Sequence, residues 1–241
     1  MASDSCSCSL ATNHKTCPLP GKTDDLYTMP SVPGYPKLRA GTQLDAIWGR
    51  MLASGKGFRR PGIKKGPGTA PGLPRVMVVF DTQCAWSHRL WDTAMILKDE
   101  IDFLWFPVCV SQDVSTAQAA AILASDTPWA LTKESEELFD DPDFRGINPK
   151  DYPVTQAQRD VAWNNSRIFR KAGGTQVPLG IYRTPDNQFV PIFGDATAEE
   201  IRKIVGIGWD AFPRHLKTAG SLQTGARGFF TSVRIFDILT G

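Results

Sequence analysis

The sequence contains no run of 18 apolar residues and no marked excess of either charge. A membrane-spanning helix needs such a run, so none is expected. The 27 Lys and Arg residues nearly balance the 25 Asp and Glu residues, so net charge predicts no nucleic acid or other charged partner. No apolar segment follows Met1 to Asp4, which excludes a signal peptide at this position. Two alternatives stay open: a cytosolic protein, or an exported one whose signal has been removed.

Cysteine is scarce and unevenly placed. An odd number of cysteines leaves at least one thiol unpaired within the chain. Three of them, together with His14, lie within the first 17 residues, but their spacing matches no common zinc pattern. A tail or a local disulfide is therefore expected there, with no metal and no cofactor. The five cysteines are Cys6, Cys8, Cys17, Cys84 and Cys109.

Composition is that of a globular protein, with 41% hydrophobic and 22% charged residues. At 241 residues the chain suits one domain with extensions. Shifts in composition predict a flexible or wrapping tail over 1–41, a short amphipathic helix over 42–54, a basic linker over 55–74, the main domain over 75–206, and a C-terminal extension over 207–241.

The segment before the main domain contains one helical pattern. Thr42 is a suitable N-cap and Gly55 follows the end. The apolar stripe needs a partner, either the main domain or a second copy of the chain. The following 55–74 segment holds ten Gly or Pro residues and is expected to form no regular element. The stripe consists of Leu44, Ile47, Trp48, Met51 and Leu52.

A strand, a cysteine and a helix follow one another in the segment 76–98. The run 76–80 is apolar and rich in valine, which predicts a buried strand. Cys84 comes next, and helical periodicity begins at Ala85. The N-terminus of a helix stabilises a thiolate, so the pKa of Cys84 is expected to lie below the free value of about 8.5. Ser87 could lower this pKa further by donating a hydrogen bond. A buried, inert cysteine is the alternative.

The segment 80–91, with the order Cys84, Ala85, Trp86, Ser87, resembles the active-site segment of the bacterial DsbC/DsbG thiol-disulfide proteins, which belong to the thioredoxin superfamily. Three other segments are similar to parts of that family: 115–125 to its inserted helix, 173–182 to its cis-proline segment, and 195–206 to its closing helix. The likeness covers roughly 75–206. It departs from the family at the second cysteine, which is Ser87 here.

This resemblance implies an α/β, thioredoxin-like fold. Its central four-stranded mixed sheet would have the order 2-1-3-4, with a helical insertion at about 111–155 between strand 2 and the cis-proline strand. Strands are expected at 76–80, 101–110, 177–182 and 188–193. Proline cannot donate to a strand ladder, so Pro191 favours an edge strand, and Pro107 favours either an edge strand or the end of its strand. Helix starts are predicted at Ser115 with Gln118, at Thr127 with Pro128, at Thr155, and at Thr197 with Glu200.

The resemblance also assigns roles around Cys84. Pro178 would follow a cis peptide bond and leave the backbone of Val177 free to pair with an extended substrate. Trp86 is expected to be exposed and to contact substrate.

Three further residues are candidate modulators of the thiol. His88 could tune it or be a solvated helix residue, and Asp81 could be a helix-entry residue or a proton relay. Cys109 is the internal candidate for resolving a mixed disulfide. Trp91 and Trp105 are expected in the core.

Two functions remain open at this point. The first is thiol-disulfide exchange on exported, periplasmic proteins, of the isomerase or reductase type, with Cys84 and Ser87 as the catalytic pair. A substrate cysteine, or an external thiol such as glutathione, would resolve the mixed disulfide. The alternative is a non-catalytic thioredoxin-fold chaperone, or a structural component of a cell-envelope assembly. Protein substrates with cysteines are the expected partners, and the oligomeric state is open.

Overall fold

The computed structural model describes residues 43–62, 75–110 and 112–207, together with the backbone of three short strands nearer the N-terminus. These three are β1 (Cys17–Pro18), β2 (Leu26–Tyr27) and β3 (Leu38–Arg39). The predictions for Cys6, Cys8, His14, most of the linker and the segment 208–241 lie outside the described residues.

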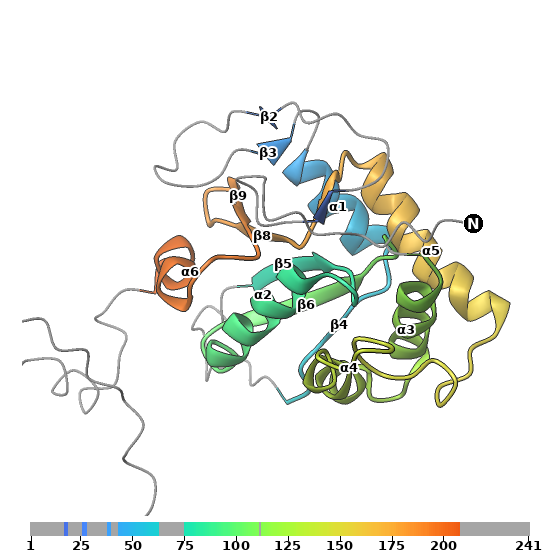
Figure 1. The fold of residues 1–241 in the computed structure, drawn as a ribbon. Helices are drawn as coiled ribbons and strands as arrows, with labels where there is room; N and C mark the ends of the chain where they lie inside the picture. Colours follow the sequence, from blue (N-terminus) through green and yellow to red (C-terminus); the bar gives the residue numbers. More distant parts are fainter. Residues whose placement is uncertain are drawn as a thin grey trace, which may run out of the picture. The chain divides into compact units, whose positions relative to one another are not determined.

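The main body contains both helices and strands (Figure 1). The helices are α1 (Leu44–Ser54), α2 (Ala85–Ile96), α3 (Gln112–Ala124), α4 (Pro128–Glu137), α5 (Gln156–Lys171) and α6 (Ala198–Ile204). The strands are β4 (Phe58–Arg59), β5 (Arg75–Phe80), β6 (Asp102–Pro107), β7 (Gln176–Val177), β8 (Leu179–Arg183) and β9 (Phe189–Ile192). No described helix is long and apolar enough to cross a membrane.

The central sheet has five strands in the order β4-β6-β5-β8-β9. The predicted four-stranded sheet with order 2-1-3-4 is therefore wrong as a description of the whole sheet. Its four strands keep their relative order, and β4 adds an edge beside β6. Only β5 and β6 pair in parallel, and the other pairs are antiparallel. The extra strand arises in the linker, where Phe58 pairs with Trp105 and fills apolar space despite the surrounding glycines.

The two prolines of the sheet have different settings. Pro191 lies in β9, which is an edge strand as predicted. β6, in contrast, is an internal strand, because β4 covers its outer side. Pro107 is tolerated there because it is the last residue of β6, where the ladder ends.

Helices pack on both faces of the sheet. Alternate residues of β5, such as Met77 and Val79, join a buried cluster with α1 and Phe169 of α5. α2 and α6 contact each other. Trp91 of α2 packs on Trp105 of β6, with ring centroids 4.9 Å apart, and both rings are buried as predicted.

Helix α1 is part of the buried core. Its stripe is buried at Leu44, Ile47, Trp48 and Met51, so packing on the main body accounts for the stripe. Leu52 is an exception: it is 44% exposed and faces away from the core. The helix begins one residue later than predicted, with Gln43 at the N-cap in place of Thr42, and Gly55 is its C-cap as predicted.

Three of the four predicted helix caps are confirmed. Thr155 with Gln158, and Thr197 with Glu200, each form a complete capping box. Thr127 is the N-cap of α4, with Pro128 as its first residue. The box predicted for Ser115 and Gln118 is wrong, because α3 begins at Gln112 and both residues lie inside the helix.

The buried side-chain amide of Asn165 joins the segment before β4 to the end of β6 through hydrogen bonds. Asn165 of α5 donates from Nδ2 to the carbonyl oxygens of Pro107 and Lys56, both at 2.9 Å. Its Oδ1 accepts from the Lys56 backbone N–H at 2.8 Å. These bonds fix the chain between α1 and β4 against the end of β6.

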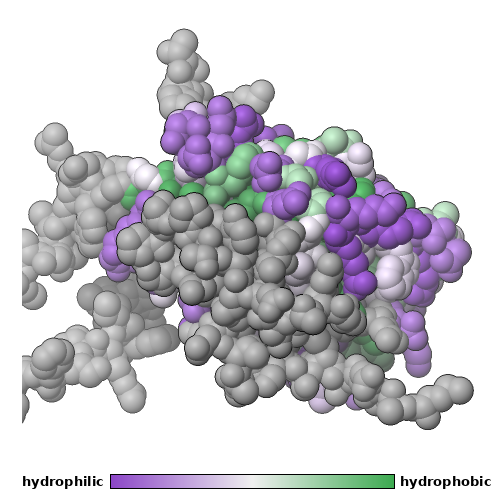
Figure 2. Space-filling view, turned by 90° about the horizontal axis from the view of Figure 1, so that it is seen from above, coloured by the Kyte–Doolittle hydropathy of each residue, from purple (hydrophilic) through white to green (hydrophobic). Residues whose placement is uncertain are grey.

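Figure 2 shows one face, on which hydrophilic residues border a band of hydrophobic ones. The most exposed large apolar side chains include Leu52, Ile96, Leu138 and Trp163.

Candidate active site

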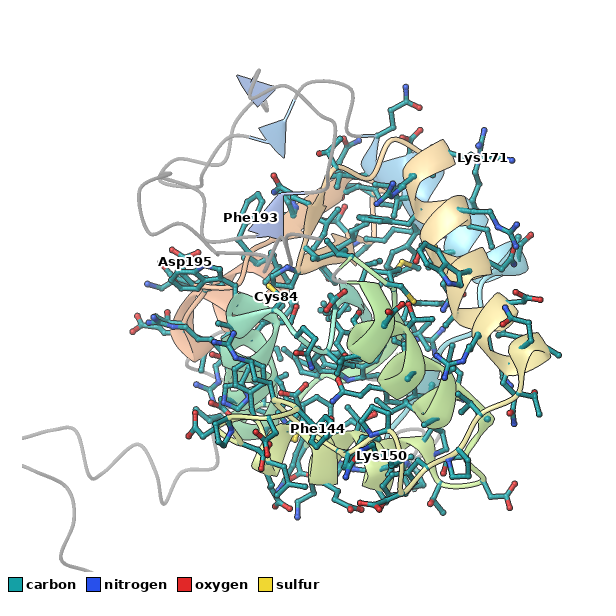
Figure 3. All side chains as sticks on the ribbon, turned by 45° about the vertical axis from the view of Figure 1, so that its right-hand side comes forward. Cys84, Phe144, Lys150, Lys171, Phe193 and Asp195 are labelled. Atoms are coloured by element: carbon teal, nitrogen blue, oxygen red, sulfur yellow. The ribbon has the colours of Figure 1, made fainter. Side chains whose placement is uncertain are left out.

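Cys84 lies at the N-terminal end of α2, as the N-cap residue (Figure 3). Its backbone N–H donates to the carbonyl of Asp81 at 3.1 Å, which closes the turn between β5 and α2. The thiol points to the carbonyl oxygen of Val177, with 3.7 Å between Sγ and oxygen. The thiol is free and only 2% of the residue is exposed. The strand-to-helix turn thus brings Cys84 to the segment before Pro178, but in a buried position.

The pKa of Cys84 was predicted to be lowered, and the structure contradicts this. Burial is the largest influence and raises the pKa of Cys84 to about 12. Hydrogen bonds from the Ser87 side chain, the Ser87 backbone and the Trp86 backbone act in the opposite direction, and the negative charge of Asp81 adds to the rise. The predicted donors are in place, but they do not outweigh the loss of water around the thiolate.

Ser87 is buried within the first turn of α2. Its hydroxyl donates to the thiolate of Cys84 and accepts from the backbone N–H of Asp81 at 3.3 Å. Ser87 therefore supports the ionised form of the thiol, in agreement with the role expected for it.

Replacing Ser87 by alanine should raise the pKa of Cys84 further and lower the thiolate fraction at every pH below it. A hydrogen bond to a charged group contributes about 1.5 kcal/mol, so we expect the alkylation rate of Cys84 to fall about tenfold. Alkylation followed by mass spectrometry against pH measures this. Thr93→Ala, on the same helix but bonded only to the carbonyl of Arg89, is the matched control and should leave the rate unchanged. Equal rates in Ser87→Ala and the unmodified protein would contradict the role of Ser87.

Asp81 is a buried structural carboxylate. Its Oδ1 accepts from the backbone N–H of Gln83 at 2.8 Å. Its Oδ2 accepts from the Ser115 hydroxyl at 2.6 Å and from the backbone N–H of Val110. These bonds join the end of β5 to α3 and to the segment that follows β6. They favour a helix-entry role for Asp81 over a proton relay. The negative charge of Asp81 also raises the pKa of the nearby Cys84.

The peptide bond between Val177 and Pro178 is cis, in agreement with the prediction. It separates β7 from β8, so the strand predicted over 177–182 is two strands. β7 does not join the central sheet. It pairs antiparallel with β1, with Cys17 opposite Val177 and Pro18 opposite Gln176. The backbone of Val177, expected to be free for a substrate, therefore pairs with a segment of the same chain.

Trp86 was expected to be exposed, but it is half-buried and packs against the core cluster that includes Cys84. The guanidinium of Arg89 lies over its ring, 5.6 Å from the centroid. One face of the indole is therefore engaged within the protein, which limits its contact with a substrate in this conformation.

His88 is neither solvated nor directed at Cys84. Its Nδ1 lies 2.8 Å from Oε2 of Glu136 in α4, and its ring stacks on Phe139 with centroids 4.3 Å apart. The bond to Glu136 raises the pKa of His88, and burial raises the pKa of Glu136. His88 thus joins α2 to α4, and its position favours a structural role over tuning of the thiol.

Cys109 is buried just beyond β6, and its backbone N–H donates to Oγ of Ser166 at 2.8 Å. Burial raises the pKa of its thiol to about 11. Cys84 and Cys109 are both free thiols, so the disulfide considered between them is not formed.

Sequence reasoning missed two features near the site. Gln83 donates from Nε2 to Oε1 of Gln118 at 2.7 Å and to the carbonyl of Phe144 at 2.8 Å, which joins the turn before Cys84 to the helical insertion. Gln176 is fully buried, and neither of its side-chain amide atoms has a hydrogen-bond partner among the described residues. For Gln176, the available sequence signal was a polar residue two positions before the predicted cis-proline. Within the described ranges no group of His, Cys, Asp or Glu residues is arranged to hold a metal ion.

Known proteins match this chain in structure but not in sequence. No protein family and no curated protein matches the sequence. Among solved structures, Proteus mirabilis ScsC in a transitional conformation matches with a TM-score of 0.52 and 14% identity, over 69% of this chain and 78% of that one.

Two other solved structures match with lower TM-scores. A periplasmic thioredoxin-like protein from Salmonella enterica serovar Typhimurium has a TM-score of 0.45 and 12% identity, over 67% of this chain and 94% of that one. MdbA, a thiol-disulfide oxidoreductase from Actinomyces oris, has a TM-score of 0.45 and 11% identity, over 64% and 89%. The match to ScsC, taken with the sheet order and the placing of the helices, shows that the chain has a thioredoxin-like α/β fold.

Proposed function

We propose that this protein carries out thiol-disulfide exchange on exported proteins, with Cys84 as the nucleophile. The observation that supports this most directly is the position of the thiol: Sγ of Cys84 lies at the N-terminus of α2, 3.7 Å from the carbonyl of the residue that precedes cis-Pro178. The thioredoxin-like fold and the resemblance of the C-A-W-S segment to the DsbC/DsbG proteins support the same function. Because the proposed substrates are protein disulfides, which persist mainly in oxidising compartments, the proposal places them outside the cytosol.

In the first step, the Cys84 thiolate attacks one sulfur of a substrate disulfide. A mixed disulfide forms between Cys84 and the substrate, and the second substrate sulfur leaves as a thiolate. Ser87 cannot take over the bond, because it carries a hydroxyl in place of a thiol. A substrate cysteine or an external thiol such as glutathione then attacks the mixed disulfide and releases Cys84. The site is thereby suited to isomerase-type or reductase-type exchange.

The burial of Cys84 adds a requirement to this function. With 2% exposure and a pKa near 12, the thiol is protonated in the described conformation and has no room for a substrate sulfur. Exchange therefore needs a local opening that exposes Cys84 and lets water or substrate groups stabilise the thiolate. The thiolate can still accept hydrogen bonds from the Trp86 and Ser87 N–H groups and from the Ser87 hydroxyl.

The same burial supports a second candidate function, a non-catalytic chaperone or envelope component built on this fold. In that case Cys84 is a packed core residue, and no mixed disulfide with a substrate forms. Buried thiols with a raised pKa are generally inert, so the two functions differ in a property that can be measured directly.

Formation of a mixed disulfide decides between them. We expect a peptide with an activated disulfide to label the protein at Cys84, and Cys84→Ala to lower labelling at this position to background. Cys109→Ser is the matched control, because Cys109 is an equally buried free thiol, and it should retain full labelling of Cys84. Labelling is read by intact mass and by peptide mapping. A protein whose Cys84 stays unlabelled while its fold is intact would support the non-catalytic function.

A further inference from the structure

The N-terminal strand β1 brings a second cysteine to the candidate site. In the antiparallel pairing of β1 with β7, Cys17 is the partner of Val177 (Figure 1, where β1 is dark blue). Directly opposed residues of antiparallel strands have Cα atoms about 4.5–5.5 Å apart. Cys17 is therefore held, by its backbone, one strand away from the residue that contacts Cys84.

Val177 links the two cysteines. Its backbone pairs with Cys17 on β1, and its carbonyl oxygen lies 3.7 Å from Sγ of Cys84. A disulfide needs Cα atoms within about 7 Å, so the disulfide requires β1 to bring Cys17 within that distance of Cys84. Cys109, the candidate considered from sequence, is held by Ser166 of α5 beyond the end of β6. The register of β1 places the backbone of Cys17 opposite Val177, which is why we consider Cys17 in place of Cys109.

The β7 segment also carries hydrogen-bonding capacity that the described residues do not use. Gln176, which pairs with Pro18, is fully buried with both side-chain amide atoms unpartnered in the described part of the chain. A buried amide without partners costs free energy, so a substrate backbone that bonds this amide when β1 is displaced would be favoured at this position.

We infer that Cys17 is the resolving cysteine for Cys84, delivered by β1. This inference rests on the proposed function, because it requires a mixed disulfide on Cys84. The substrate displaces β1 from β7 and forms that mixed disulfide, with its first sulfur leaving as a thiolate. When β1 returns, the Cys17 thiolate attacks Sγ of Cys84, the Cys17–Cys84 disulfide forms, and the second substrate sulfur leaves.

The electrons balance in this sequence. The two protein thiols lose two electrons and two protons, and the substrate disulfide gains them as two thiols. A dithiol reductant then returns the Cys17–Cys84 pair to its reduced form by the same chemistry. Cys17 thereby supplies the role that Ser87 cannot perform.

The disulfide can be identified by tryptic mapping without reduction. Trypsin separates Cys17, on the peptide 16–22, from Cys6 and Cys8, on 1–15, and places Cys84 on 76–89. After oxidation with a disulfide oxidant, we expect peptides 16–22 and 76–89 to be linked in the full-length protein. A link from 76–89 to 1–15 or to the Cys109 peptide, or no link to Cys84, would overturn the assignment.

The kinetic test uses the mixed disulfide itself. In Cys17→Ser, formation of the mixed disulfide at Cys84 should be retained, and its resolution in the absence of external thiol should slow at least tenfold. Cys6→Ser and Cys8→Ser are the matched controls and should resolve at the original rate. Adding Ser87→Cys to Cys17→Ser should restore resolution, because it introduces a thiol three residues from Cys84.

The outcomes separate this inference from the function on which it rests. Unchanged resolution in Cys17→Ser, with the mixed disulfide still formed, overturns the role of Cys17 alone. Failure to form any mixed disulfide at Cys84 overturns the proposed function and the role of Cys17 together.

Discussion

Replacing Asp81 by alanine is expected to destabilise the fold by about 3–5 kcal/mol. The carboxylate is fully buried and accepts hydrogen bonds from Gln83, Ser115 and the Val110 backbone. Without it, these donors are left inside the protein with no acceptor, and each unmet donor costs about 1–3 kcal/mol. The free energy of unfolding, measured by urea titration at constant slope, checks this value.

Asp99 provides the matched control for this prediction. It is also bonded, to Arg60 at 2.7 Å, but its side chain is 73% exposed. Asp99→Ala should therefore change the free energy of unfolding by no more than about 1 kcal/mol. A loss as small in Asp81→Ala would mean that the buried network is replaced by water or by rearranged partners.

The second large effect is expected for Trp105→Ala, at about 3–5 kcal/mol. The indole of Trp105 is fully buried and contacts the rings of Phe80, Trp91 and Phe103. Its removal leaves a cavity between β6 and α2 and eliminates three aromatic contacts. The same urea titration measures the loss.

Trp163→Ala tests whether burial, and not the tryptophan type, produces this effect. Trp163 lies on α5 and is 42% exposed. Its replacement should lower the free energy of unfolding by clearly less than that of Trp105, since a large part of its surface stays in contact with water in the folded protein. Equal losses at the two positions would contradict the assignment of Trp105 to the central core.

The sequence predicted the features that depend on neighbours along the chain. The apolar run before Cys84 and the periodicity after it predicted β5 and α2 in the correct order. The caps at Thr155 and Thr197 were predicted because their partners lie three residues away. The placement of Cys84 at a helix N-terminus belongs to the same class, whereas the cis bond before Pro178 was expected from the resemblance to the DsbC/DsbG proteins.

Contacts between distant residues were not predictable in this way. Ser115 was taken for a helix cap, but it bonds Asp81, 34 positions away, and His88 pairs with Glu136, 48 positions away. The linker was expected to be irregular, yet Phe58 and Arg59 pair with β6 because the sheet offers an open edge. Such partners are brought together by packing, and no local pattern encodes them.

The chemistry of the site divides along the same line. By itself, the sequence placed Cys84 at the start of a helix and Ser87 one turn later. Its resemblance to the DsbC/DsbG proteins placed Pro178 opposite Cys84. Tertiary structure alone decided the burial of Cys84, the rise of its pKa to about 12, and the pairing of Cys17 with Val177. The physical reason is that helix geometry acts within a few residues, whereas desolvation depends on every segment packed around the sulfur.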